Sequence, residues 1–361
     1  MKKDMGFSKS LLTWYDKNAR VMPWRLPPNS QQEPNPYFIW LSEIMLQQTT
    51  VATVSSYFNK FIIKWPNIID LSNADDNDVM ASWAGLGYYA RARNLLKCAR
   101  IIVAQYNGFF PKSYEELIKL PGIGPYTASA ISSIAFSKPY AVLDGNVERV
   151  MSRYYSILDP LPASKGELRI LAQSNLHTYR PGDHNQAIMD LGATICTPTK
   201  PNCIGCPVNS ACKAYIIGNA ESLPKKLPKK KKPLKFGSLF IGAHPTNGFL
   251  VERRTESGLL GGMLSWPSTD WSSCPSSDPP LSADWVPILG RVQHTFTHFN
   301  LELNIFKATI KRSIDPYFFI PTECFNSNDM PTVMRKAFDL YLNSEHRSKK
   351  TPRKERGVVK V

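Results

Sequence analysis

Apolar residues recur at helical spacing along the first part of the chain, and the pattern changes after residue 235. The densest apolar segment, Tyr37–Met45, follows Asn35 and Pro36, which suit the N-cap and first position of a buried helix. Breaks such as Pro66 and Gly85 separate it from the other apolar repeats. The pattern predicts a helical region over residues 8–217, with helices near 51–63, 75–83, 89–106, 126–136 and 145–155.

The second part of the chain has a different pattern. Residues 221–235 (ESLPKKLPKKKKPLK) combine prolines with like charges, which favours an extended linker. Beyond them, Asn247-Gly248 separates two strand-like segments, as in a β-hairpin. Residues 299–310 alternate like a strand, and 331–343 predict a closing helix. We therefore predict a mainly α region at 1–220, the linker at 221–235, an α+β domain at 236–344 and a disordered basic tail at 345–361.

The net charge of +15 suggests a polyanionic partner, but most of it lies in two segments. Residues 223–235 contribute +7 and residues 347–361 contribute +6, which leaves about +2 for the rest. A nucleic acid would therefore meet the folded parts at local patches, while the basic segments add salt-sensitive attraction. The chain has neither an apolar run that could span a bilayer nor a secretory pattern at Met1–Ser10. We expect a cytoplasmic bacterial protein, or a nuclear one if the source is eukaryotic.

Four of the seven cysteines, Cys196, Cys203, Cys206 and Cys212, form the pattern C-x6-C-x2-C-x5-C. Four thiolates suit either a tetrahedral zinc ion or a cubane iron–sulfur cluster. Only the central pair has the spacing of a zinc knuckle, and the wider outer spacings favour the larger cluster. Spacing alone leaves zinc open. The remaining cysteines, Cys98, Cys274 and Cys324, are scattered, and we expect them to be buried small apolar residues.

A short glycine-rich turn, Leu120-Pro121-Gly122-Ile123-Gly124, joins two predicted helices. Glycines allow a sharp turn and a close approach to a phosphate, and Pro125 suits the start of the next helix. The N-terminal end of that helix would present free N–H groups to the anion. By itself the turn is equally consistent with a plain helix connection.

Two acids are candidates for cleaving a glycosidic bond, which requires a proton donor and a group that stabilises a sugar cation. Glu43 is an isolated acid among apolar residues, and burial would raise its pKa. Asp144 precedes a predicted helix, whose N–H groups would keep it ionised. The alternatives are that Glu43 turns to solvent and that Asp144 is an ordinary N-cap.

Together, these motifs resemble the endonuclease III superfamily of helix–hairpin–helix DNA glycosylases over residues 8–217. The resemblance implies a six-helix barrel and a [4Fe–4S] cluster on the four cysteines. It also implies DNA-backbone contacts by Gly122, Gly124 and Lys200. The bifunctional branch carries a lysine two residues after the second hairpin glycine, where this chain has Tyr126. A phenol cannot form a Schiff base, so a monofunctional enzyme is expected.

Further segments resemble adenine DNA glycosylases of the MutY type, and residues 236–344 resemble their MutT-like (Nudix-fold) domain. The segments are MPWR (22–25), SEIMLQQT (42–49), GLGYYARARNL (85–95), VLDGNVERV (142–150) and NQAIMDLGATIC (185–196). The resemblance implies base excision repair in which adenine opposite 8-oxoguanine or guanine is flipped out and removed. Glu43 would protonate the adenine and Asp144 would stabilise the sugar cation. Tyr126 would align the acid, and Asn146 would organise water or the aspartate.

The same resemblance assigns substrate recognition. Gln48, Leu86 and Tyr88 would fill the gap in double-stranded DNA and probe the opposite base, and Arg25 and Asp190 would line the adenine pocket. Phe296, Thr297 and His298 match a short F-S-H loop that contacts 8-oxoguanine. No Nudix-type acidic helix is visible, so this domain should bind a lesion without hydrolysing nucleotides. Rival hypotheses are an enzyme for oxidised pyrimidines and a non-catalytic lesion-binding iron–sulfur protein. We expect a monomer.

Overall fold

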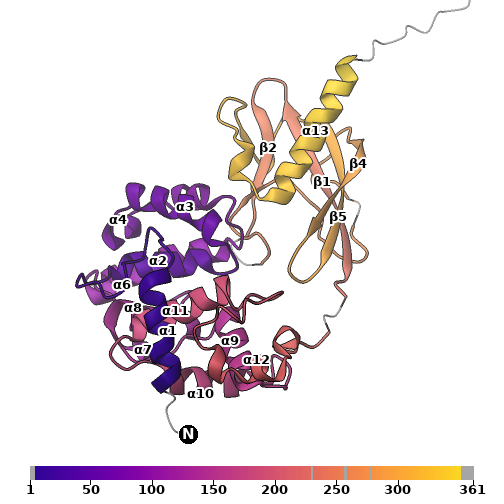
Figure 1. Ribbon diagram of the computed structural model, residues 1–361. Helices are drawn as coiled ribbons and strands as arrows, with labels where there is room; N and C mark the ends of the chain where they lie inside the picture. Colours follow the sequence, from indigo (N-terminus) through magenta and orange to yellow (C-terminus); the bar gives the residue numbers. More distant parts are fainter. Residues whose placement is uncertain (1–4, 229–230, 256–257, 277, 351–361) are drawn as a thin grey trace, which may run out of the picture. The chain divides into compact units, whose positions relative to one another are not determined.

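The structure is a computed structural model that describes residues 5–228, 231–255, 258–276 and 278–350 (Figure 1). Its described residues form two compact units. The first contains the residues up to Val79 and those from Arg91 to 228, and the second contains Met80–Ala90 and the residues from 231 onward. Within the described part of the chain, no helix is long and apolar enough to cross a membrane.

The chain up to residue 217 is helical, as the apolar pattern predicted. Local caps explain where several helices begin: the Asn35 side chain accepts a hydrogen bond from the Tyr37 N–H, and Ser113 caps α7 and also bonds Glu116. The helices are α1 (Met5–Asn18), α2 (Pro36–Leu46), α3 (Val51–Lys64), α4 (Ile68–Ser72), α5 (Asp76–Trp83), α6 (Ala90–Tyr106), α7 (Tyr114–Leu117), α8 (Pro125–Phe136), α9 (Gly145–Tyr155), α10 (Lys165–Asn175), α11 (Pro181–Thr194) and α12 (Lys213–Ile217).

Helices α2 and α11 are central to the first unit. Helix α2 packs against α3 and α8, while α11 packs against α1, α8 and α9. Eight residues of α2 are buried, so this helix has almost no solvent-facing side. One buried interior therefore lies between these packed helices. It receives side chains from α2, α8, α9 and α11.

The second unit is built on a mixed sheet covered by α13 (Thr332–Lys350), which Figure 1 shows lying across it. The strand order is β3-β2-β1-β5-β4, with β6 paired to β2, and β1 and β5 are parallel. Trp266 and Met334 belong to its apolar core. The strands are β1 (Leu234–His244), β2 (Gly248–Arg253), β3 (Leu264–Ser265), β4 (Val286–Thr295), β5 (Asn300–Thr309) and β6 (Phe318–Ile320).

The predicted hairpin is confirmed, because β1 and β2 pair antiparallel across a turn at residues 245–247, and Gly248, which follows the turn opposite His244, has a φ of 90°. Two boundaries differ from the prediction. Leu223, at the start of the expected linker, is buried, and Lys226 forms a β-bridge with Leu161, so the linker is shorter than predicted. Helix α13 continues through residue 350, so the expected tail begins in a helix, whereas 351–361 lie outside the described residues.

The scattered cysteines were predicted to be buried, and this holds only for Cys98. Cys274 and Cys324 are exposed. An isolated cysteine carries no periodic pattern that would indicate which way it faces, so the expectation rested on residue type alone.

Candidate active site

A cavity of about 480 Å³ in the first unit brings the predicted catalytic residues together. Glu43 comes from α2, Tyr126 from the first turn of α8, and Asp144 and Asn146 from the N-terminal end of α9. Arg25, from the loop before α2, also lines it. Residues as far apart in sequence as Arg25 and Asn146, 121 positions, thus meet because α2, α8 and α9 pack around one space.

Glu43 is 6% exposed, and its Oε2 atom has no hydrogen-bond partner in the described protein. Burial raises its pKa to about 7 and the nearby charge of Asp144 adds to the shift, while the Tyr126 hydroxyl and Arg25 oppose it. The carboxyl can therefore carry a proton near neutral pH. An unpaired oxygen beside open space is available to donate that proton to a bound molecule.

Asp144 is the N-cap of α9 and accepts three hydrogen bonds. Its Oδ1 accepts from the N–H groups of Asn146 (3.0 Å) and Val147 (2.8 Å), and its Oδ2 accepts from the Asn146 amide (2.8 Å). Burial nevertheless raises the pKa of Asp144, although these bonds and the Arg149 charge oppose the change. The hydrogen bonds at the helix end thus favour the ionised form, as expected, while desolvation, which the sequence did not reveal, is the larger effect on the pKa.

Tyr126 connects the acid to α11. Its hydroxyl donates to the Met189 sulfur at 3.3 Å and also contacts Glu43, and burial holds the pKa of this phenol well above its usual value. The group stays protonated and can orient Glu43. No amine stands at this position, which removes the nucleophile of a lyase reaction.

Arg25 and Asp190 occupy different places. Arg25 lines the cavity, and its Nε has no partner in the described protein. Asp190 is fully buried behind it, with salt bridges of 2.7 Å to both Arg20 and Arg25, and is not a lining residue. Asp190 thus holds the arginine that faces the cavity.

Gln186 also lines the cavity, and the sequence reasoning missed it. The signal was present, because Gln186 and Asp190 are four residues apart and share one face of α11. Arg20 was missed because nothing in the local sequence links it to α11.

The N-terminal end of α9 is joined to the cysteine loop by Arg149. This side chain donates to the Asn146 amide oxygen (2.8 Å), to the Gly192 carbonyl (2.7 Å) and to the Cys196 carbonyl (2.6 Å). A side chain at Gly192 would collide with Asn146, so α11 can approach α9 this closely only with glycine there. Asn146, in turn, holds Asp144.

The four cysteines of the C-x6-C-x2-C-x5-C pattern line one small apolar cavity together with Arg153. Arg153 is 1% exposed and donates to the Cys196 sulfur (3.3 Å) and to the carbonyls of Thr197 and Leu223. It forms no ion pair with a carboxylate of the described residues, and a buried charge normally has a compensating partner. The site therefore suits an anionic group, such as four thiolates around a cluster. Among the described residues, no group of three or more acidic, cysteine or histidine side chains is arranged to hold a metal ion.

Comparison with known proteins identifies this architecture. Residues 41–172 match the family described as HhH-GPD superfamily base excision DNA repair protein, and residues 239–340 match the NUDIX domain. The chain is 34% identical to adenine DNA glycosylase of Homo sapiens, over 94% of this chain and 74% of that protein. It is 37% identical to the Buchnera aphidicola (Acyrthosiphon pisum) enzyme of the same name, over 82% of this chain and 85% of that protein. The chain belongs to the adenine DNA glycosylase family.

Solved structures support the helical fold of the first unit. A thermostable thymine-DNA glycosylase superposes with a TM-score of 0.52 at 30% identity, over 58% of this chain and 95% of that one. Endonuclease III in a non-covalent DNA complex superposes with a TM-score of 0.50 at 22% identity, over 59% of this chain and 94% of that one. This likeness supports the fold. This adenine DNA glycosylase family member is a monofunctional base excision repair glycosylase, a hydrolase of N-glycosidic bonds, and its partner is DNA.

The residues expected to contact DNA share a backbone feature. Gln48, Tyr88 and Lys200 have positive φ values of 57°, 49° and 47°, and all three side chains are exposed. Such left-handed backbone costs a non-glycine residue about 1–3 kcal/mol and is typically concentrated at functional sites. Leu86, by contrast, is 5% exposed, so its side chain does not reach the surface in this structure. In the hairpin, Gly122 has a φ of 77° and Gly124 caps α8.

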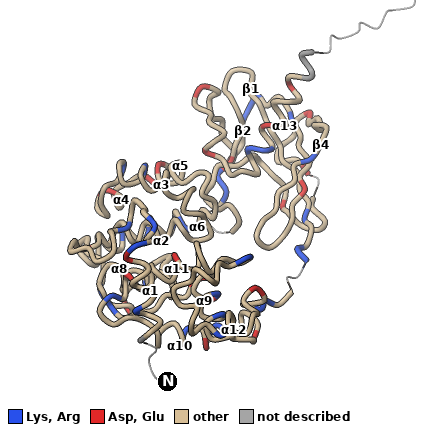
Figure 2. The backbone as a smooth tube through the Cα atoms, in the orientation of Figure 1, with Lys and Arg blue, Asp and Glu red and all other residues tan. Residues whose placement is uncertain are grey.

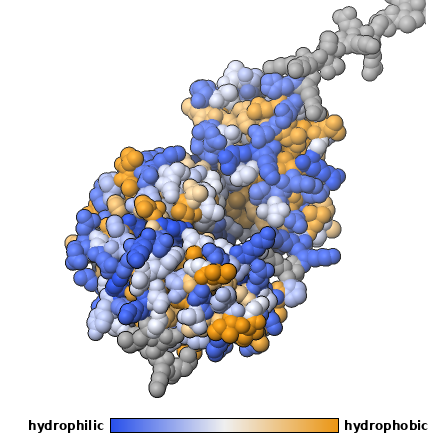
Figure 3. Space-filling view, viewed as in Figure 1, coloured by the Kyte–Doolittle hydropathy of each residue, from blue (hydrophilic) through white to orange (hydrophobic). Residues whose placement is uncertain are grey.

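In the view of Figure 2, no single part of the first unit's backbone concentrates the charged residues. Acidic and basic residues are interspersed along its backbone in Figure 2. In Figure 3 apolar residues gather over α12, where Ile216 and Ile217 are 68% and 64% exposed. Local groups rather than overall charge must therefore place the nucleic acid.

The glycosylase's second unit presents the F-T-H loop between β4 and β5. The loop is closed by the Phe296 N–H donating to the Phe299 carbonyl at 2.8 Å, and Lys232 donates to the Phe296 carbonyl at 2.7 Å. Phe296 is half-buried, while Thr297 and His298 are exposed. The Thr297 hydroxyl is hydrogen-bonded to the Tyr88 hydroxyl at 3.1 Å, which joins two residues expected to read the lesion.

Proposed function

We propose that this glycosylase removes adenine paired with 8-oxoguanine or guanine in double-stranded DNA. The observation that carries the proposal is the unpaired Oε2 of buried Glu43 in the cavity that also holds Asp144. It acts as a monomer on DNA in the bacterial cytoplasm, or in the nucleus of a eukaryote. The rival substrate, an oxidised pyrimidine, belongs to a branch whose lysine is replaced here by Tyr126.

The chemistry follows from the two acids. Adenine flipped into the cavity receives the Glu43 proton on a ring nitrogen, which draws the electrons of the breaking C–N bond into the base. The Asp144 carboxylate stabilises the positive charge that develops on the sugar. Water then adds to the sugar and its proton returns to the site, so that free adenine and an abasic strand are the products. Tyr126 orients Glu43, and Asn146 orients Asp144.

Recognition of 8-oxoguanine rests on the paired hydroxyls of Thr297 and Tyr88. Guanine has an acceptor at N7, whereas its 8-oxo form has a donor there and an added carbonyl oxygen. A hydroxyl can accept from that donor or give its proton to that oxygen. An exposed Thr297 held in a closed loop is therefore suited to distinguish the two bases.

The test removes these contacts. Replacing Phe296, Thr297 and His298 by alanine, or Thr297→Val alone, should lower the ratio of excision rates opposite 8-oxoguanine and guanine. For Thr297→Val we expect a decrease of about fivefold, since one hydrogen bond contributes about 1 kcal/mol. Single-turnover excision on both duplexes measures the ratio, with Thr246→Val, in the β1–β2 turn, as the matched control. Equal losses on both duplexes would contradict the proposal.

We also propose that Cys196, Cys203, Cys206 and Cys212 hold a [4Fe–4S] cluster. Support comes from their shared apolar cavity, the buried Arg153 beside Cys196 and the family of the chain. When bound, the cluster supplies a rigid, anionic anchor for the loop. Cys196 is linked through Arg149 and Asn146 to Asp144, so the loop also supports the catalytic acid.

Arg153→Met should lower the iron content of the purified protein to less than half that of the native protein. The change leaves an anionic cluster without its buried cation and several carbonyls without donors, each worth about 1 kcal/mol. Iron analysis and visible absorbance measure the effect, and Arg169→Met, at an exposed position of α10, is the control. Full iron content in Arg153→Met would show that this arginine does not hold the cluster.

A further inference from the structure

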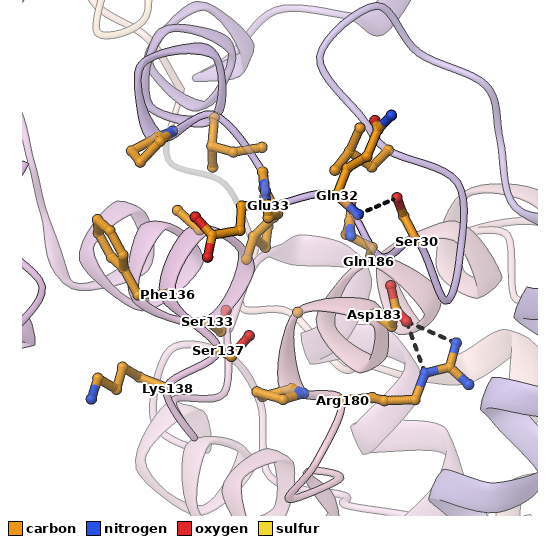
Figure 4. Close-up of a pocket in the computed structure, with 18 of the residues that line it drawn as sticks. Ser30, Gln32, Glu33, Ser133, Phe136, Ser137, Lys138, Arg180, Asp183 and Gln186 are labelled. Atoms are coloured by element: carbon orange, nitrogen blue, oxygen red, sulfur yellow. Dashed lines mark hydrogen bonds and ion pairs between the residues drawn. The ribbon is translucent and has the colours of Figure 1, made fainter.

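A second cavity, of about 690 Å³, adjoins the catalytic cavity in the first unit (Figure 4). It is formed by the loop before α2, the C-terminal end of α8 and the N-terminal end of α11. Ile39, Ile134 and Gln186 line both cavities. The catalytic side chains Glu43, Tyr126 and Asp144 do not line this space, although its size is typical of ligand-binding sites.

The three shared side chains form a thin wall that contains one polar group. Ile39, Ile134 and Gln186 are 4%, 7% and 8% exposed. The Gln186 side chain has no hydrogen-bond partner among the described residues and is not one of their fully buried unpaired groups, so its amide is open to the cavity space. Its amide carries both donors and an acceptor, which complement the amino group and ring nitrogen of adenine.

The lining of the second cavity suits a neutral polar molecule. Three basic and two acidic side chains line it, which gives a net charge of +1. They are Lys112, Lys138, Arg180, Glu33 and Asp183. Arg180 is already paired with Asp183 at 2.7 Å and with Asp16 outside the cavity. Figure 4 shows that pair on one side and Glu33 above Ser133 and Ser137 on the other. A phosphate would find little net attraction here, whereas a free base would find donors and acceptors.

We propose that adenine, once freed, passes through the wall of Ile39, Ile134 and Gln186 into this second cavity and leaves the enzyme there. The inference rests on the proposed adenine excision. While the flipped nucleotide is bound, its sugar and strand fill the entrance of the catalytic cavity and the base lies innermost. Rotation of these three side chains opens the wall without moving a helix.

The test separates bond cleavage from release of the base. Excess enzyme is mixed with duplex carrying radiolabelled adenine opposite 8-oxoguanine, and the complex is collected on filters at successive times. Alkali-sensitive strand breaks report cleavage, and label in the filtrate reports free adenine. For the native enzyme we expect adenine in the filtrate as fast as cleavage, while the abasic DNA stays on the filter.

Ala135→Trp and Ser30→Trp fill the second cavity without touching the catalytic one. Each should leave cleavage unchanged and slow the release of adenine at least tenfold, until release coincides with dissociation of the DNA. Ala104→Trp, at an exposed position of α6 outside both cavities, should release adenine at the native rate. Melting curves confirm that each variant is folded.

Two results would overturn the inference. One is that adenine cleaved by the native enzyme stays on the filter until the DNA dissociates. The other is that both tryptophan variants are folded and release adenine at the native rate. Absence of cleavage by the native enzyme on this duplex would instead contradict the proposed substrate, so the two failures are distinguishable.

Discussion

Glu43→Gln should slow adenine excision by about 10³-fold or more, because general acid catalysis typically contributes 10²–10⁴-fold. Glutamine keeps the shape of the side chain but cannot supply a proton to the departing base. Since Glu43 is buried and its Oε2 has no hydrogen-bond partner among the described residues, the change breaks no internal hydrogen bond of that atom. Binding to the mispaired duplex should stay within a few fold of the native affinity.

The pH dependence of the native enzyme gives an independent readout. The general acid must be protonated, and the pKa of Glu43 is about 7, so the single-turnover rate should fall as the pH rises through 7. Asp144 must be ionised, and its pKa is raised, so the rate should also fall on the acid side, at a higher pH than for a free aspartate. The residual activity of Glu43→Gln should lack the alkaline decrease.

Glu115→Gln is the matched control, because Glu115 is an exposed acid remote from the cavity. It should change neither the rate nor its pH dependence. If Glu43→Gln excised adenine at the native rate, the acid would have to be another group, and a non-catalytic lesion-binding role would regain support.

Asp144→Asn should also reduce excision by about 10³-fold, since removing a preorganised electrostatic contact typically costs 10²–10³-fold in rate. Asparagine is an equally good N-cap, so α9 should form and the protein should keep its melting temperature within a few degrees. The loss would then reflect the missing negative charge beside the sugar cation. Excision rate, duplex affinity and thermal unfolding are the three measurements.

Asp75→Asn separates charge from capping. Asp75 caps α5 through a 2.8 Å hydrogen bond to the Asn77 N–H and is exposed outside the cavity. It should tolerate the change with native activity. An Asp144→Asn variant that unfolded at low temperature would show that Asp144 acts mainly as a cap, whereas an active, stable variant would remove it from the mechanism.

Structure that depends on neighbours in sequence was predictable. The caps Asn35 and Ser113 and the Asn247-Gly248 turn rest on hydrogen bonds or dihedral angles within about three residues. The burial of Glu43 was predictable as well, because apolar residues surround it on every side of its helix. Strand β4 was not anticipated, since most of its residues are exposed and its apolar alternation is weak.

The sequence by itself determined which chemical groups the glycosylase carries: two acids in different local settings, a phenol in place of an amine, and four closely spaced cysteines. Only the tertiary structure decided how they act together. It placed Asp190 behind Arg25, raised the pKa of Asp144 by burial, buried Leu86, and set Gln186 in a wall between two cavities. The physical reason is that desolvation, ion pairing and cavity shape depend on groups far away in the chain, which meet only when the helices pack.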